Sequence, residues 1–424
     1  MPSVYIESYG CSNSQTEAEI MAGLLRKSGF DIVSSEKNAD LLIVVTCYVK
    51  SPTQQKILFR IRQLNEKYPD KRMIIAGCMP EGIHSRLVEV SPESSMVSTH
   101  HVKEIVKAAE KTLKGKRVEY LGKSEQVKLC LPKIRRNPLI DIVPISSGCS
   151  SSCSYCCVNL VKGRLFSYPK DMIVKEVQDS VKQGCREVWI TSQDNASYEN
   201  GKLPVLMNDI SGISGNFRVR IGMMNPKNVL SILPNLIESY RNEKIFKFLH
   251  LPVQSGDDAI LKKMNRGYKA KDFERIIKGF DNNFRYQLWT DVIVGFPGET
   301  EKQFQNTFKL IEKVRPDWVN VSKYGHRPNT QASKMKRLDS KTVTKRSSKL
   351  SSLVRRLSLE KNREWIGWEG EIMIYKRGKA MNQWFGRNFA YKQFMVAMKG
   401  SFLGKRVPVR AVQARRAFMV AEPA

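Results

Sequence analysis

The chain has 424 residues, nine of them cysteines, and its formal charge of +30 corresponds to a sequence pI of about 9.8. It contains neither an apolar run of membrane-spanning length nor an N-terminal signal pattern, so we expect no membrane partner and a cytoplasmic location. The charge indicates a polyanionic partner, most simply a nucleic acid. The cysteines favour metal or redox chemistry over a disulfide framework.

Residues 1–112 are predicted to form an α/β domain with an open parallel sheet. Strands are expected at residues 4–10, 41–46 and 73–77, and a helix is expected at residues 16–29. Cys11, Cys47 and Cys78 each follow one of these strands. Because the carboxyl ends of parallel strands share one edge of a sheet, where ligands bind, the three cysteines predict a metal site. Each cysteine alone could equally be a small buried residue.

Residues 113–137 are polar and basic and are interpreted as a linker. Residues 138–362 then alternate between apolar runs and amphipathic stretches, which predicts a parallel sheet curled into a partial (β/α)6 barrel. The six expected strands lie at residues 141–145, 187–191, 218–221, 246–249, 288–294 and 318–321. Functional side chains are expected where these strands end.

Three cysteines in a C-x3-C-x2-C pattern, Cys149, Cys153 and Cys156, follow the first of these strands. A four-iron, four-sulfur cube normally takes four thiolates, so three on one loop leave one iron open to chelate a small molecule. The alternative is a zinc knuckle. Zinc usually takes four ligands with histidine partners or two separated cysteine pairs, and the loop has no histidine.

Residues 363–424 are predicted to form a small antiparallel β-barrel of the oligonucleotide-binding type. Residues 361–424 hold thirteen Lys and Arg against four Glu, a net charge of +9. Aromatic side chains alternate with these cations, a pattern that suits stacking on unpaired bases. The candidate RNA-binding residues are Trp384, Arg387, Tyr391 and Lys392. A solvated basic face over an aromatic core is the alternative.

Several sequence blocks resemble the radical S-adenosylmethionine methylthiotransferases over nearly the whole chain. The C-x3-C-x2-C loop is joined by the blocks at residues 9–19, 45–49, 76–78, 162–169, 191–194, 250–256 and 290–300. Residues 164–169, 322–324 and 386–391 are most similar to the archaeal and eukaryotic branch. That branch modifies N6-threonylcarbamoyladenosine, at position 37 of tRNA, next to the anticodon.

The resemblance implies two [4Fe-4S] clusters, one on Cys149, Cys153 and Cys156 and an auxiliary one on Cys11, Cys47 and Cys78. It also implies S-adenosylmethionine as cofactor and a C-terminal TRAM domain that binds RNA rather than DNA. The expected partners are a tRNA anticodon stem-loop, a one-electron reductant and a sulfur donor. Strand ends supply the candidate contacts to S-adenosylmethionine, which are Gln193, Asp194, Gln254, Ser255 and Phe296.

The reaction implied by the resemblance is the transfer of a methylthio group to C2 of the adenine. The C2–H bond is neither acidic nor electrophilic, so radical chemistry from a cofactor is required. Two other substrates fit the same scaffold, N6-isopentenyladenosine in tRNA and an aspartate of a ribosomal protein. A non-enzymatic iron–sulfur protein that binds RNA or carries electrons would leave the cysteine loop and the barrel without a purpose.

Overall fold

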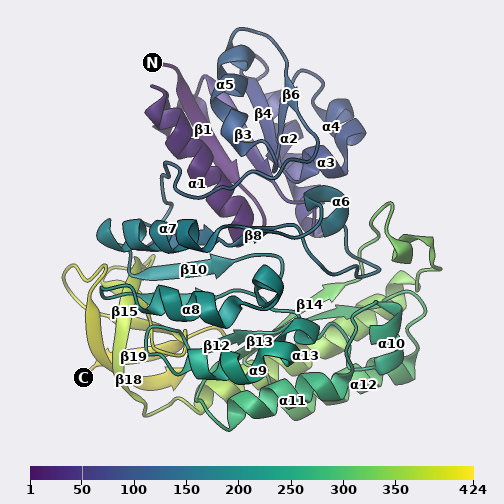
Figure 1. The fold of residues 1–424 in the computed structure, drawn as a ribbon, viewed down its shortest axis with the longest axis vertical. Coiled ribbons are helices and arrows are strands. Elements are labelled where there is room, and N and C mark those ends of the chain that lie inside the picture. Colours follow the sequence, from purple (N-terminus) through teal and green to yellow (C-terminus); the bar gives the residue numbers. More distant parts are fainter. Residues whose placement is uncertain (50) are drawn as a thin grey trace.

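The computed structural model describes residues 1–49 and 51–424, without the side chain of residue 51. Figure 1 shows three parts: an N-terminal α/β part at the top, a central part of parallel strands and helices, and a C-terminal β-barrel beside the central part. This arrangement confirms the predicted fold class. Among the described residues, no helix is long and apolar enough to cross a membrane.

The N-terminal part is a six-stranded, fully parallel sheet in the order β2-β1-β3-β4-β5-β6. Its apolar side chains form one buried cluster on each face of the sheet, and helices cover both. All six residues of the central strand β3 are buried, as its continuous apolar run predicts. The elements are β1 (Ser3–Ser8), α1 (Ser12–Lys27), β2 (Asp31–Val33), β3 (Leu41–Thr46), α2 (Ser51–Lys67), β4 (Arg72–Gly77), α3 (Met79–Gly82), α4 (His84–Val90), β5 (Ser95–Ser98), α5 (Ile105–Leu113) and β6 (Glu119–Tyr120).

The segment expected as a linker packs tightly between the N-terminal and central parts. It begins with β6, the edge strand of the N-terminal sheet. Lys128 is buried against α1, and the Ile134 N–H donates to the Glu19 carbonyl at 2.9 Å. The Thr16 hydroxyl of α1 donates to the Ile142 carbonyl at 2.9 Å. Buried polar contacts therefore fix the N-terminal part on the central one.

The central part contains six parallel strands, as predicted. They form two sheets, β11-β10-β7 and β12-β13-β14, which a parallel bridge between Val219 and Ile245 joins into one curved sheet. Helices cover its outer face, and a single large apolar core fills the space between the helices and the sheet. The strands are β7 (Ile140–Pro144), β10 (Glu187–Thr191), β11 (Arg218–Ile221), β12 (Phe248–His250), β13 (Gln287–Val294) and β14 (Trp318–Lys323).

The helices and short elements of the central part follow the same alternation. The short strands β8 (Ser146–Ser147) and β9 (Phe166–Ser167) pair with each other on either side of the cysteine-rich segment. The helices are α6 (Val158–Lys162), α7 (Lys170–Lys182), α8 (Leu203–Ser211), α9 (Pro226–Tyr240), α10 (Asp258–Lys263), α11 (Ala270–Asp281), α12 (Glu301–Val314) and α13 (Ser340–Arg363).

The C-terminal barrel (residues 369–423) is closed in the order β15-β16-β17-β19-β18. Four of its pairings are antiparallel, as predicted, whereas β17 and β19 run parallel. Its strands are β15 (Glu369–Arg377), β16 (Gln383–Arg387), β17 (Gln393–Ala397), β18 (Arg406–Ala414) and β19 (Met419–Pro423).

This barrel docks on the amino ends of the central strands (Figure 1). Lys392 Nζ lies 2.7 Å from an oxygen of Asp317, just before β14. The Lys247 N–H, just before β12, donates to the Phe389 carbonyl at 2.9 Å. Arg387 pairs with Glu187, the first residue of β10. The C-terminal barrel and the cysteine loop therefore lie at opposite ends of the central strands.

Candidate iron–sulfur and substrate site

The cysteine loop (residues 148–157) leaves the carboxyl end of β7 and carries the C-x3-C-x2-C pattern. Backbone N–H groups point at two of its sulfurs, from Ser151 to Cys149 Sγ at 3.4 Å and from Val158 to Cys156 Sγ at 3.5 Å. Burial raises the pKa of Cys149 and of Cys156. Thiols in such a setting need a metal to be held as thiolates, and the N–H groups stabilise that charged form.

Arg266 holds the third sulfur of the loop. Its Nη1 donates to Cys153 Sγ at 3.3 Å, and its Nη2 donates to the Pro252 carbonyl at 3.1 Å. The side chain is buried. Next to it, the Met264 carbonyl accepts a hydrogen bond from the Ser154 N–H at 3.0 Å. The segment after α10 therefore fixes the cysteine loop in place and adds a positive charge to it.

The three N-terminal cysteines follow β1, β3 and β4, which are neighbours in the sheet. A Cβ at Gly10 would lie 2.8 Å from Cys47 Sγ, so the Cys47 side chain packs directly on the backbone beside Cys11. Burial, with Cys11 nearby, raises the pKa of Cys47. Burial also raises the pKa of Cys78, to about 12, against the opposing charge of Lys162. The fold thus brings the predicted strand ends together.

The short helix α6 connects the two cysteine sets. It starts directly after the cysteine loop, where the Cys157 thiol donates to the Tyr48 carbonyl at 3.9 Å, one residue beyond Cys47. It ends at Lys162, and the next carbonyl, of Gly163, accepts from the Cys149 N–H at 3.3 Å. α6 also packs against α3, the helix that follows Cys78. The two sets therefore meet along one seam between the N-terminal and central parts.

A buried charge cluster lies beneath this seam. Glu17 Oε1 lies 2.6 Å from Lys128 Nζ and 3.9 Å from Lys162 Nζ, and it accepts a hydrogen bond from the Thr99 hydroxyl at 2.5 Å. Burial alone would lower the pKa of Lys162, but Cys78 and Glu17 beside it raise that pKa above its usual value. Lys162 is therefore a cation facing the N-terminal cysteines. Sequence reasoning noted this position without assigning it a role.

Each donor set consists of three thiols, the ligand type that holds an iron–sulfur cluster. As the side chains stand, no three Cys, His, Asp or Glu groups in the described chain converge closely enough to share one ion. A four-iron cube binds each thiolate through a different iron, so its ligands are spaced more widely than those of a zinc ion. The cations Arg266 and Lys162 beside the sulfurs suit an anionic cluster.

The predicted contacts to S-adenosylmethionine all lie near the carboxyl ends of central strands, but three of the five are already engaged. The Asp194 carboxylate accepts hydrogen bonds from the Asn225 N–H at 2.9 Å and from the Asn228 side chain at 2.6 Å. Ser255 and Phe296 are fully buried. The two glutamines, Gln193 and Gln254, are half-buried and keep side-chain groups for a ligand.

An additional polar pair, which sequence reasoning left without a role, lies on adjacent central strands. His250 Nε2 at the end of β12 is 2.6 Å from Asp291 Oδ2 in β13. His250 is half-buried, and Asp291 occupies one of the half-buried positions of β13, which alternate with fully buried ones. Only the pairing of β12 with β13 reveals the contact, because 41 residues separate the two in sequence.

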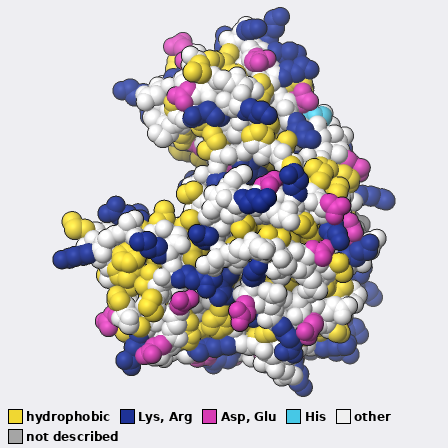
Figure 2. All heavy atoms as spheres, turned by 60° about the vertical axis from the view of Figure 1, so that its left-hand side comes forward, with side chains coloured by type: hydrophobic (Ala, Val, Ile, Leu, Met, Phe, Trp, Pro, Cys, Tyr) yellow, Lys and Arg dark blue, Asp and Glu magenta, His cyan; other side chains and the backbone are white. Residues whose placement is uncertain are grey.

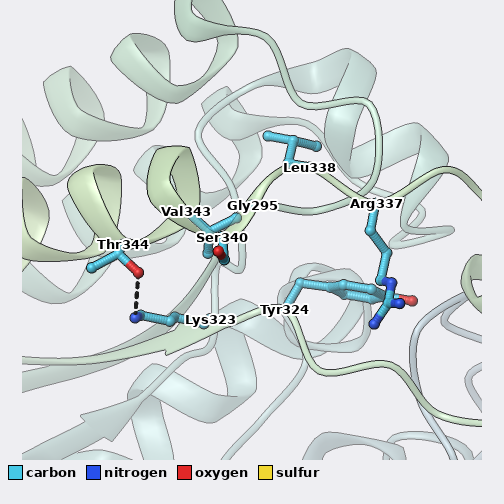
Figure 3. Close-up of a pocket in the computed structure, with 8 residues that line it drawn as sticks. All are labelled: Gly295, Lys323, Tyr324, Arg337, Leu338, Ser340, Val343 and Thr344. Atoms are coloured by element: carbon cyan, nitrogen blue, oxygen red, sulfur yellow. Dashed lines mark hydrogen bonds between the residues drawn. The ribbon is translucent and has the colours of Figure 1, made fainter.

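A cavity of about 660 Å³ lies where β13 and β14 end and α13 begins. Figure 3 shows Arg337 beside the ring of Tyr324, and Lys323 Nζ donating to the Thr344 hydroxyl at 2.9 Å. The Tyr324 hydroxyl is buried without a hydrogen-bond partner in the described structure. Two cations and a hydroxyl make this cavity polar and positive, at the same end of the sheet as the cysteine loop.

The four residues predicted to bind RNA lie inside the protein, which differs from the expectation. Lys392, Tyr391 and Trp384 are buried, and the Arg387 side chain is 10% exposed. Arg387 pairs with Glu187 at 2.6 Å, and Tyr391 packs between Phe246 and Phe248. Interleaved aromatic and basic residues serve a domain interface as well as an RNA surface, because both rely on stacking and cation–π contacts.

Exposed cations remain available on the C-terminal barrel. All of them occupy solvent-exposed positions on its strands and turns. These cations are Lys376, Arg377, Lys379, Lys399, Lys405, Arg406, Arg410, Arg415 and Arg416. In Figure 2, Lys and Arg side chains outnumber acidic ones on the visible face. The same view shows the surface hollowed below the N-terminal part. A basic surface of this kind suits the phosphate backbone of a nucleic acid.

Comparison with known proteins places the chain in a family. Residues 3–99 match "Uncharacterized protein family UPF0004", and residues 143–311 match the "Radical SAM superfamily". A "Probable threonylcarbamoyladenosine tRNA methylthiotransferase" of Methanothermobacter thermautotrophicus is 41% identical over 392 residues, 92% of each chain. The "Threonylcarbamoyladenosine tRNA methylthiotransferase" of Homo sapiens is 30% identical over 432 residues, 99% of this chain and 74% of the human one. The chain belongs to this methylthiotransferase family.

Solved structures show the same fold in more distant proteins. The radical S-adenosylmethionine methyltransferase TsrM of Kitasatospora setae superposes with a TM-score of 0.57 at 14% identity, over 78% of this chain and 75% of that one. The cobalamin-dependent S-adenosylmethionine radical enzyme OxsB gives a TM-score of 0.53 at 11% identity, over 78% of this chain and 55% of that one. In this chain, the cysteine loop lies near the start of the residues that match the radical SAM superfamily.

Proposed function

We propose that this chain converts N6-threonylcarbamoyladenosine at position 37 of tRNA, next to the anticodon, to its 2-methylthio derivative. The observation that carries the proposal is the seam where α6 brings two sets of three cysteines together. The names of the similar proteins supply the substrate. No described feature favours N6-isopentenyladenosine or a protein aspartate over this nucleoside.

We assign Cys149, Cys153 and Cys156 to one [4Fe-4S] cluster and Cys11, Cys47 and Cys78 to a second, with S-adenosylmethionine as cofactor. These groups supply reductive cleavage and the radical chemistry that an unreactive C2–H bond requires. The chain contributes the ligands, the charges of Arg266 and Lys162 beside them, and a buried setting. Gln193 and Gln254 are the side chains best placed to contact the cofactor.

The partners of the proposed reaction follow from its chemistry. The tRNA anticodon stem-loop provides the base, and the exposed cations of the C-terminal barrel, which we assign as a TRAM domain, suit its phosphates. Radical cleavage of S-adenosylmethionine consumes one electron, so a one-electron reductant is required. The methylthio group requires a sulfur donor. All of these partners imply a cytoplasmic protein.

The test is mass spectrometry of nucleosides after the anaerobically reconstituted protein has acted on tRNA that carries N6-threonylcarbamoyladenosine. The 2-methylthio nucleoside should appear only with S-adenosylmethionine, a reductant and a sulfur source present. A variant with Cys149, Cys153 and Cys156 changed to Ala is the control and should give no product. An active preparation that modified N6-isopentenyladenosine or a ribosomal protein instead would contradict the proposal.

A further inference from the structure

Arg327 is a buried cation without an acidic partner in the described structure. It lies in the loop after β14 and is 4% exposed. Its Nη1 donates to the side-chain carbonyl of Gln54 in α2, while its Nη2 is buried and has no hydrogen-bond partner among the described residues. By contrast, the buried Arg346 pairs with Glu299 at 2.9 Å, and Arg387, whose side chain is 10% exposed, pairs with Glu187 at 2.6 Å.

A buried guanidinium is normally paired, because the loss of its hydration must be offset by hydrogen bonds and by an opposite charge. The neighbours of the Arg327 guanidinium are neutral: the Gln54 side chain, and Tyr48, whose ring centre lies 4.6 Å from the guanidinium carbon and whose hydroxyl also interacts with Arg327. Its planar fork matches a carboxylate, which could accept from two of its N–H groups. The free N–H therefore points to an anionic ligand.

The position of Arg327 places that ligand at the seam between the two cysteine sets. The Arg327 guanidinium stacks over the ring of Tyr48, which directly follows Cys47. The Tyr48 carbonyl accepts a hydrogen bond from the Cys157 thiol. A Cβ at Gly82 would lie 2.5 Å from the Tyr48 ring, so this ring also packs on the helix after Cys78.

We propose that Arg327 binds the carboxylate of the threonylcarbamoyl group and so selects the substrate. The inference rests on the proposed function, which requires C2 of the adenine to face both cysteine sets. The threonylcarbamoyl group extends from N6 of that base and ends in a carboxylate. An isopentenyl group at N6 has no charge and would leave Arg327 unpaired, which disfavours that substrate.

The experiment compares two anticodon stem-loop RNAs, one with N6-threonylcarbamoyladenosine and one with its methyl ester. Wild-type holoenzyme should bind the acid about tenfold or more tightly than the ester, since the ester cannot form the buried charged hydrogen bond. In Arg327→Gln, this ratio should fall to about one, whereas Arg327→Lys should keep part of it. A ratio near one in the wild type would overturn the proposal, even if the variants failed to fold.

Arg346→Gln is the matched control, because Arg346 is also buried but has its own glutamate. It should lower stability without changing the acid-to-ester ratio. S-adenosylmethionine also carries a carboxylate, so its affinity is measured in the same variants. If Arg327→Gln lowered the affinity for S-adenosylmethionine but not for the RNA, the assignment would be overturned. A wild-type enzyme that makes the 2-methylthio product equally well from acid and ester would refute this inference while leaving the proposed function intact.

Discussion

Single side chains join the C-terminal barrel to the central part, and Tyr391 is the clearest case. Side chains from neighbouring central strands surround its ring, including Trp189 of β10, Arg220 of β11 and Phe248 of β12. Its φ of 62° lies in the left-handed region, and its N–H donates to the Asn388 carbonyl at 3.0 Å in a tight turn. The turn therefore presents Tyr391 to the interior of the curved sheet.

Arg387 provides a stability test at the residue scale. Replacing it with Leu would leave the fully buried Glu187 without its cationic partner, with only the Trp189 indole N–H still donating to it at 3.0 Å. We expect a decrease of about 3–5 kcal/mol in the free energy of unfolding. Urea denaturation would measure the decrease, and Glu187→Leu in the same chain should recover part of it. Weaker RNA binding with unchanged stability would instead return Arg387 to the RNA surface.

At the scale of elements, β7 is held by a buried charge network. Asp141 Oδ1 lies 3.1 Å from Lys133 Nζ and 3.2 Å from Arg135 Nε, and both cations come from the segment expected as a linker. Burial acts to raise the pKa of Asp141, but these two cations outweigh it and hold the pKa below its usual value. The strand that precedes the cysteine loop is thus fixed by charge as well as by backbone pairing.

Asp141→Asn tests this network through its pH dependence. A carboxyl whose pKa is lowered by folding contributes stability above its unfolded pKa of about 3.9, and that contribution is lost as the pH falls through the folded pKa. The variant should therefore be less stable than wild type by about 3–5 kcal/mol at pH 7. The gap should narrow below about pH 4. Urea unfolding at several pH values would measure it, and a gap that does not depend on pH would rule out an electrostatic role.

Elements and strand ends were predictable from sequence, whereas many contacts between them were not. Continuous apolar runs identified β3 and β4, and the cysteines after them were placed correctly at one sheet edge. How the three parts dock on one another decides that Tyr391 and Arg387 lie inside the protein. It also decides that Arg327 is buried without an acidic partner in the described structure. Docking joins residues that are far apart in sequence, for which local periodicity carries no signal.

At the scale of the whole molecule, the cysteine loop and the C-terminal barrel lie at opposite ends of the central strands. An RNA that contacted both would therefore extend along the side of the central part. Replacing the exposed Lys376, Arg377, Lys405 and Arg410 with Gln should weaken tRNA binding. Its salt dependence should become shallower by about 0.7–0.9 for each phosphate that the variant no longer neutralises. Filter binding at several salt concentrations would measure the slope, and an unchanged slope would move the RNA surface to the central part.

The central claim is that one chain holds two clusters at one seam, and iron content combined with cleavage of S-adenosylmethionine tests it most directly. The anaerobically reconstituted protein should contain about eight irons per chain. Changing Cys149, Cys153 and Cys156 to Ala should remove half of the iron and all cleavage. Changing Cys11, Cys47 and Cys78 to Ala should remove the other half and leave some uncoupled cleavage. Full iron content in that second variant would contradict the account.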